Sequence, residues 1–181
     1  TYEGIEFGFG RPEYVATLPD FRKRGLVRAQ FDVMHQWSAE RGLMVQGITG
    51  IPYFYRQFGY EFALNLGGRR FGSVPPKLKD GASEMYAVRP AEEKDIPFLM
   101  SVYEHGCKRS MVSAKWIQAH WHNNLYEMSR ENVQKLEFRV IERVDSQEAV
   151  GYLAHPGYLA ISGGHAFQYE LKPGVSWLEV S

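Results

Sequence analysis

The sequence has little of several features that would narrow its function at once. Cys107 is the only cysteine among 181 residues, which excludes an intrachain disulfide and a zinc site built from several cysteines. Lys and Arg together number 21, as do Asp and Glu, so no overall field favours nucleic acid or anionic lipid. There is no apolar run of about 18 residues and no signal-peptide pattern. We therefore expect a cytoplasmic protein with no nucleic-acid, membrane or metal partner.

The chain is well supplied with apolar and aromatic residues. Hydrophobic residues make up 44% and charged residues 23% of the sequence, which is typical of a globular protein that buries a core. Eleven Tyr, eleven Phe and four Trp add side chains that suit packed cores and clefts. The length suits one large domain or two small ones.

The first part of the chain reads as strand, helix and strand. Residues 12–18 are predicted to form a strand, and residues 43–48 a short buried strand. Between them, apolar residues recur at steps of three and four, which predicts a helix over 26–41 that ends before Gly42. The predicted packed face of this helix holds Leu26, Ala29, Val33, Met34 and Trp37. This order is typical of a βαβ unit with parallel pairing.

A turn at 49–52 leads into a predicted second, shorter helix that contains Tyr55 and ends at Gly59. Residues 60–66 read as another strand. The following residues, 67–84, are dense in Gly, Pro and charge, which predicts a linker or a long surface connection.

The second half begins with a predicted strand over 85–89. Asp95 is expected to cap a helix whose apolar face holds Ile96, Leu99, Met100, Tyr103 and Cys107. A further helix is predicted near 113–126. The remaining predicted strands are 138–144, 150–155, 158–162, 165–171 and 175–180. Cys107 falls on the apolar helix face and is expected to be a core residue, not a nucleophile.

The sharpest chemical signal is the basic turn Arg22-Lys23-Arg24-Gly25, which lies between the first predicted strand and helix. The first N–H groups of a helix have no intrahelical partner, and with the positive end of the helix dipole they suit a pyrophosphate. Gly25 lets the backbone approach a ligand closely. A solvated basic turn before an ordinary helix would have the same sequence, so this stretch alone leaves both interpretations open.

The second signal is the aromatic and basic stretch 51–61. A phenol near the end of a βαβ unit can protonate a leaving thiolate. Tyr55 and Tyr60 can equally be packing residues with a hydrogen-bonded hydroxyl, and taken alone this stretch favours the packing interpretation.

Together, the two stretches resemble motifs A and B of the GNAT superfamily of N-acetyltransferases. The motif A turn reads Arg or Gln, x, x, Gly, x, Gly or Ala, and residues 22–27 read Arg-Lys-Arg-Gly-Leu-Val. Residues 54–60, Phe-Tyr-Arg-Gln-Phe-Gly-Tyr, are similar to motif B. The resemblance covers roughly residues 12–66. It implies an α/β fold of GNAT type, with a mixed sheet and helices on both faces. It also implies transfer of an acetyl group from acetyl-CoA, the cosubstrate, to a primary amine.

The resemblance also assigns roles to individual residues. Matching positions are Val15, Ala16 and Thr17 for the pantetheine arm, Lys23, Arg24, Gly25, Leu26, Val27 and Arg28 for the pyrophosphate, and Gly50 and Ile51 for the thiol end. Tyr55 matches the general acid toward the coenzyme A thiolate. Val27 departs from the family pattern, because a β-branched residue stands where a second small residue is usual, and we expect it to crowd the pyrophosphate.

Residues 85–96, Met-Tyr-Ala-Val-Arg-Pro-Ala-Glu-Glu-Lys-Asp-Ile, resemble the opening of many GNAT domains. We therefore expect residues 1–70 to be the C-terminal half of one GNAT domain, 71–84 to be a linker, and 85–181 to be the N-terminal half of a second domain without a cofactor motif. This tandem build is similar to that of the enhanced intracellular survival family of aminoglycoside acetyltransferases.

Several points stay open. No general base stands out, since Glu3, Glu6 and Glu13 can equally be surface carboxylates, and His35 is expected to face solvent. The acceptor can be a small-molecule or a peptide amine. The protein can also bind coenzyme A without catalysis, as a sensor or a structural half. A nucleic-acid contact at the basic turn is the least favoured alternative, and an open sheet edge would invite self-association.

Overall fold

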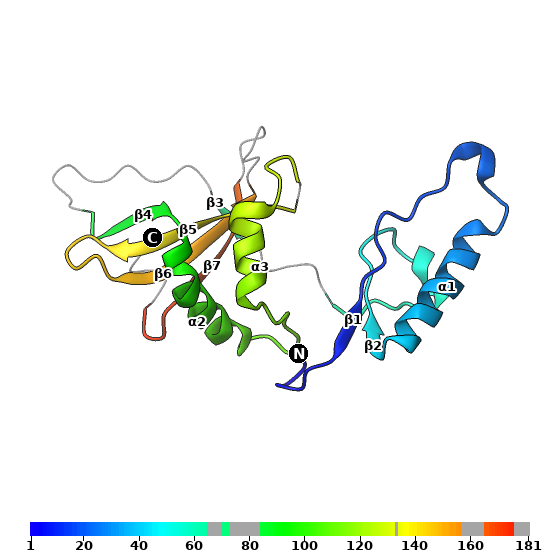
Figure 1. The fold of residues 1–181 in the computed structure, drawn as a ribbon, viewed down its shortest axis with the longest axis horizontal. Helices are drawn as coiled ribbons and strands as arrows, with labels where there is room; N and C mark the ends of the chain where they lie inside the picture. The colour runs from blue at the N-terminus through cyan, green and yellow to red at the C-terminus, as the bar shows by residue number, and fades with distance from the viewer. Residues whose placement is uncertain (65–69, 73–83, 133, 157–164, 176–181) are drawn as a thin grey trace. The chain divides into compact units, whose positions relative to one another are not determined.

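The computed structural model describes residues 1–64, 70–72, 84–132, 134–156 and 165–175, with only the backbone described at 70–72 and 165–168. The chain divides into two compact units, Thr1–Leu66 (unit 1) and Gly67–Ser181 (unit 2), which are coloured from blue to cyan and from green to red in Figure 1. Within the described ranges, no helix combines the length and the apolar character needed to cross a membrane.

Unit 1 contains the predicted βαβ arrangement, with β1 (Gly8–Gly10), α1 (Leu26–Glu40), β2 (Leu43–Gln46) and the short 3-10 helices η1 (Pro19–Phe21) and η2 (Phe54–Phe58). The expected parallel pairing is confirmed between β1 and β2. The first strand was misplaced, however, because residues 12–18 form no strand. Pro12 has no N–H to donate to a ladder, and Tyr14 has a positive φ of 54°, so the chain leaves the sheet before these residues.

The bounds of α1 agree with the prediction, and Gly42 follows it with the positive φ of 65° that a C-terminal glycine allows. Its packed face was predicted wrongly except at Met34. Phe31 is fully buried, whereas Leu26, Val33 and Trp37 are 41%, 43% and 52% exposed. The half-buried residues of the helix are Val27, Met34, His35 and Ser38. The helix is turned this way because the Phe31 ring stacks on the ring of Phe58, with centroids 4.2 Å apart.

Two further expectations for unit 1 are wrong. The strand expected to be buried at 43–48 is shorter and partly open, since Met44 is 78% and Val45 44% exposed. Residues 60–64 form no strand, while 65 and 66 lie outside the described residues. β1 and β2 therefore make a two-stranded sheet, with both outer edges free within the described part of the chain.

The described residues of unit 2 form a five-stranded sheet in the order β3-β7-β6-β5-β4. Its strands are β3 (Arg70–Gly72), β4 (Tyr86–Pro90), β5 (Leu136–Arg143), β6 (Ala149–Pro156) and β7 (His165–Leu171), and its helices are α2 (Ile96–Cys107) and α3 (Gln118–His122), the latter extended by the π-helical turn η4 (Asn123–Glu127). The expected order of strand, two helices and antiparallel strands is confirmed. The predicted linker was wrong at 70–72, which pair with β7. The predicted strand 158–162 and residues 176–180 lie outside the described residues.

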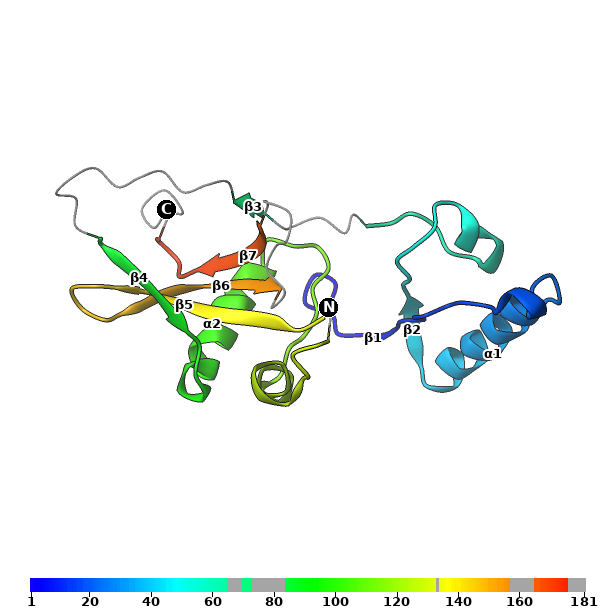
Figure 2. The same cartoon turned by 90° about the horizontal axis from the view of Figure 1, so that it is seen from above.

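The fold is mixed α/β, but the single mixed sheet of our expectation is not seen. Parallel pairing occurs in unit 1, and the described pairs of unit 2 are all antiparallel. Helices α2 and α3 lie on one face of the unit 2 sheet, as Figure 2 shows, and not on both. The buried residues of this core are Ile96, Leu99, Val102, Trp121, Phe138, Val140, Tyr152 and Ala154. A smaller cluster consists of Ile141, Val150 and Leu171.

Polar contacts fix the start of α2. Asp95 directly precedes the helix as predicted, but its side chain does not cap α2. It accepts two bonds from Arg89, at 2.6 and 2.8 Å, and one from the backbone N of Glu92, at 2.8 Å. The Arg89 hydrogen bonds hold the pKa of Asp95 below its ordinary value. Arg89 also donates to Glu142 on β5, so one guanidinium joins β4, the start of α2 and the sheet.

Candidate functional site

The basic turn of unit 1 leaves the N-terminus of α1 open. Lys23 and Gly25 have positive φ values of 60° and 73°, and Gly25 suits this conformation because it has no side chain. A Cβ placed at Gly25 would meet no atom within 4 Å. No side chain caps α1, and its first turn contains no acidic residue. The first N–H groups of α1, together with the helix dipole, therefore form an uncapped, electropositive end.

The four basic side chains of residues 22–28 have different surroundings. Arg22 donates to the backbone O of Thr17 at 3.3 Å, and the Arg24 guanidinium lies 5.4 Å from the ring centroid of Phe21. Arg28 donates to Gln57 Oε1 at 3.1 Å. The Lys23 side chain is exposed and makes no hydrogen bond or ion pair with another described residue. Lys23 and Arg24 can therefore meet an anion without giving up a hydrogen bond to the protein.

The segment predicted to hold the pantetheine arm lies outside the β1–β2 ladder. The last backbone hydrogen bond between the two strand segments before residues 15–17 runs from Gly47 N to Gly10 O, at 2.9 Å. Ala16 is exposed, while Val15 and Thr17 are half-buried. Within the described residues, no backbone N–H of these three donates to another backbone group. Backbone N–H groups without a backbone partner are what an amide-containing arm needs for strand-like pairing.

Val27 departs from the family turn, but its location limits the expected crowding. It is half-buried and lies one helical turn before the fully buried Phe31, on the packed face of α1. A side chain on this face points away from the exposed side of the turn. The Leu26 and Val27 N–H groups belong to the uncapped end of the helix.

Tyr55 lies in η2, in a small aromatic group. Its ring centroid is 5.9 Å from that of Phe31 and 6.3 Å from that of Tyr60. A Cβ placed at Gly50 would lie 2.9 Å from Tyr55 Cε2, so the loop before η2 contacts the tyrosine ring directly. Ile51, beside it, is 65% exposed. The structure therefore brings Gly50 and Tyr55 together, and Ile51 follows Gly50 in the chain.

Gln57, Gln46 and Ser38, to which the sequence analysis gave no role, help to hold this aromatic group in place. Gln57 connects Arg28 to the backbone O of Phe54. The Tyr60 hydroxyl donates to Gln46 Oε1, and burial raises the pKa of Tyr60. Gln46 Nε2 in turn donates to Ser38 Oγ at 2.5 Å. Except for Gln57 and Phe54, these partners are 8 to 29 residues apart in the chain, so no local sequence pattern marks their contacts.

A general base is still not identified. Glu13 forms an ion pair with Arg11, and Glu3 is exposed. The expectation that His35 faces solvent is wrong, because it is half-buried and its ring lies 5.9 Å from that of Phe31 and 5.8 Å from that of Tyr60. Packing against these two rings explains its position. Within the described part of the chain, no three His, Cys, Asp or Glu side chains are grouped so that they could hold a metal ion.

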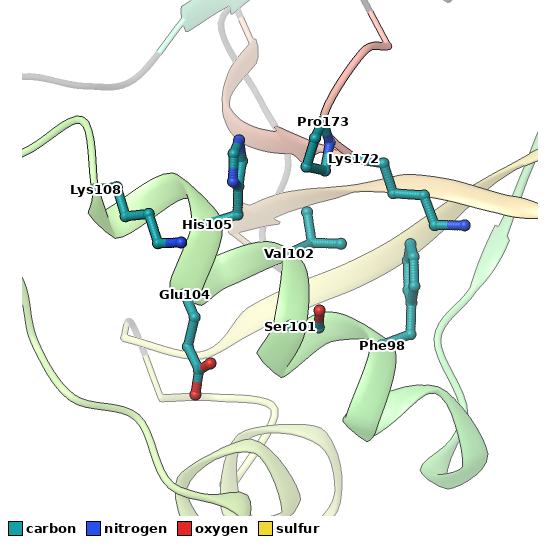
Figure 3. A pocket seen from close by; sticks show the side chains of 8 residues that line it. All are labelled: Phe98, Ser101, Val102, Glu104, His105, Lys108, Lys172 and Pro173. Atoms are coloured by element: carbon teal, nitrogen blue, oxygen red, sulfur yellow. The ribbon is translucent and has the colours of Figure 1, made fainter.

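Unit 2 contains a shallow hollow of about 300 Å³ beside α2 (Figure 3). It is lined by Phe98, Ser101, Val102, Glu104, His105, Lys108, Lys172 and Pro173. None of these residues was predicted to form a site. Lys172 is paired with Glu148 at 2.7 Å and lies over the Phe98 ring, while Glu104 adds one carboxylate to the lining. The hollow thus has no excess of one charge that would select a ligand class.

The expectation that Cys107 is a core residue is met only in part. The residue is half-buried and lies beside Tyr103, whose hydroxyl donates to the backbone O of Ala114 at 2.9 Å. Burial, followed by the effects of Cys107 and Glu170, raises the pKa of Tyr103.

Comparisons of this chain with protein-family models, curated proteins and solved structures found no match.

Proposed function

We propose that unit 1 binds acetyl-CoA at residues 22–28 and transfers its acetyl group to a primary amine, as a GNAT-type N-acetyltransferase. The observation that carries this proposal is the uncapped basic end of α1. This end of α1 follows the segment 15–17, which lies outside the β1–β2 ladder. Arg28 connects it to η2, which contains Tyr55. Anion site, free backbone and phenol are the three parts that the motif resemblance requires.

Each part of the cofactor has a matching part of unit 1. The pyrophosphate would take the N–H groups of Leu26 and Val27 and the charges of Lys23 and Arg24. The pantetheine amides would pair with the backbone at 15–17. The thioester would then lie toward Gly50 and Tyr55.

The proposed chemistry is direct transfer. The acceptor nitrogen attacks the thioester carbonyl carbon, the C–N bond forms, and collapse of the tetrahedral intermediate breaks the C–S bond. The Tyr55 hydroxyl donates its proton to the departing sulfur and regains one from solvent, while the amine loses one proton to solvent or to a base. Products are the amide and coenzyme A. The protein contributes orientation of the two reactants and a placed acid.

A second candidate is coenzyme A binding without transfer. One observation favours it: the ring contacts of Tyr55 among the described residues come from Phe31, Phe54 and Tyr60, with no carboxylate or imidazole among them. Both functions require binding at the same turn, so the two candidates differ only in turnover.

The test compares Tyr55→Phe with Tyr53→Phe, which removes an exposed hydroxyl beside the same helix. Thiol release from acetyl-CoA would be followed with a panel of aminoglycosides, polyamines and lysine peptides. We expect Tyr55→Phe to bind acetyl-CoA normally and to lose roughly 10²- to 10⁴-fold in turnover, with Tyr53→Phe close to the wild type. Unchanged turnover in Tyr55→Phe would refute the acid role. Binding without any turnover by the wild type would favour the second candidate.

A further inference from the structure

The contacts of Arg28 join the basic turn to the helix that contains Tyr55. Its Nη2 donates to Gln57 Oε1 at 3.1 Å, and its guanidinium lies 5.4 Å from the centroid of the Phe58 ring. Gln57 is held at its other end, because its Nε2 donates to the backbone O of Phe54 at 3.1 Å. A continuous set of contacts therefore runs from the first turn of α1 to the peptide group that precedes Tyr55.

Arg28 keeps donors for a ligand while it makes these contacts. A guanidinium has five N–H donors, and a single one is used on Gln57. The contact with Phe58 involves the ring face and consumes no N–H group. A phosphate oxygen at the end of α1 can therefore bind Arg28 without breaking its bond to Gln57.

The packing of η2 makes Tyr55 sensitive to this contact. Phe58 stacks on Phe31 of α1, with an angle of 4° between the ring planes. The Tyr55 backbone O accepts a bond from Tyr60 N at 3.2 Å. A shift of η2 along α1 would move Tyr55 with it, and a misplacement of about 1 Å can lower a rate roughly 100-fold.

We propose that Arg28 is a positioning residue that couples anion binding at residues 22–28 to the placement of Tyr55. This inference rests on the proposed function of the same site. It gives Arg28 a role different from that of Lys23 and Arg24, which make no hydrogen bond to η2 within the described residues. Those two side chains determine affinity, whereas Arg28 determines whether η2 is held when the ligand is bound.

Hydrogen exchange with coenzyme A as the probe tests the coupling directly. In the full wild-type chain, saturating coenzyme A is expected to slow exchange both at residues 22–28 and at 54–60. The test variants are Arg28→Met, which keeps an apolar stem over Phe58, and Gln57→Leu. Lys23→Met is the matched control, since it removes one charge from the same turn without touching η2.

Three results are expected. At saturation, Lys23→Met protects both segments, although its Kd rises roughly 3- to 5-fold, the effect of about one exposed ion pair. Arg28→Met and Gln57→Leu protect residues 22–28 only. The double variant behaves like either single one, because both changes remove the same contact. Circular dichroism of each variant would verify that the chain is folded.

The outcomes separate this proposal from the proposed function. If residues 54–60 are still protected in Arg28→Met, the coupling role is overturned and the proposed function is not. The same holds if coenzyme A protects only residues 22–28 in the wild type. No protection of either segment in a folded wild-type chain would overturn both. If an acceptor is found, Arg28→Met should lower kcat on the order of tenfold, with KM for acetyl-CoA raised no more than in Lys23→Met. Equal effects of the two variants on kcat would contradict the proposal.

Discussion

The two units of this chain bury their side chains to very different extents. Among the described residues, eleven apolar side chains are buried in unit 2, whereas unit 1 buries Phe31 and Pro12. In unit 1, α1 leaves Leu26, Val33 and Trp37 exposed. Few buried contacts imply a low local stability. The candidate site thus lies in the unit whose structure depends on a small number of contacts, and unit 2 has the more extensive core.

The largest expected effect is that of Phe31→Ala, which removes the ring that stacks on Phe58 and contacts Tyr55. Loss of a buried Phe is worth about 3–5 kcal/mol, more than we expect unit 1 to withstand. Limited proteolysis should then cut within residues 1–64 while unit 2 stays protected. Phe138→Ala, the matched change in unit 2, should lower the Tm of that unit but leave it folded. If unit 1 resists proteolysis equally in the wild type and in Phe31→Ala, the claim that unit 1 depends on few buried contacts is contradicted.

Arg89→Met is the next largest change, and it affects unit 2. It leaves the buried Asp95 carboxylate without its bidentate partner and also removes the bond to Glu142. We expect unit 2 to lose about 3 kcal/mol in its free energy of unfolding, the lower end for a broken buried pair. Chemical denaturation followed by tryptophan fluorescence would measure it. Lys94→Met, which breaks the exposed pair with Glu92, is the control and should have little effect.

Gly106→Ala tests the packing of α2 against β7. A Cβ at this position would collide with the carboxyl group of Glu170, which is paired with Arg109. We expect a loss of at most about 1 kcal/mol, because the Glu170 carboxyl group is the movable end of its side chain and its displacement mainly weakens the pair with Arg109. The same denaturation curves would measure this loss. Ser101→Ala, on the exposed side of α2, is the control. A more stable Gly106→Ala protein would mean that helix propensity outweighs the collision.

The smallest effect is the dependence of unit 2 stability on pH. Because Arg89 lowers the pKa of Asp95, its contribution to stability is fully present above the unfolded pKa of about 3.9 and is lost as the pH falls through the folded value. The denaturant concentration at the midpoint of unfolding should therefore decrease when the pH is lowered below about 4. The decrease should be smaller in Arg89→Met. If acid lowers the stability of Arg89→Met as much as that of the wild type, other carboxylates cause the loss.

The sequence predicted the elements of this chain better than their contacts. The bounds of α1 follow from apolar periodicity and Gly42, and the start of α2 after Asp95 was also indicated by local sequence. The packed face of α1 was wrong because the helix has two apolar stripes, and only the distant Phe58 selects the one containing Phe31. The first strand was misplaced for a similar reason, since pairing with β2 determines that Gly8–Gly10 form it.

The candidate site shows the same limit. The basic turn and Tyr55 were predicted from two short stretches, because each belongs to a pattern of residues that are close together in the sequence. The bond from Arg28 to Gln57 joins residues 29 positions apart, and no periodicity indicates it. The acceptor site and the general base could not be predicted. The shape of the site and the position of the base depend on contacts between segments, and no motif in this chain indicates those contacts.

The measurement that tests the central claim most directly is calorimetric titration of the full chain with acetyl-CoA. The variant is Arg24→Glu in the basic turn, and the control is Arg41→Glu, the same charge reversal just beyond the other end of α1. We predict saturable binding of one acetyl-CoA per chain by the wild type and by Arg41→Glu, and its loss in Arg24→Glu. Absence of binding by the folded wild type, or equal binding by both variants, would contradict the assignment of residues 22–28 as the cofactor site.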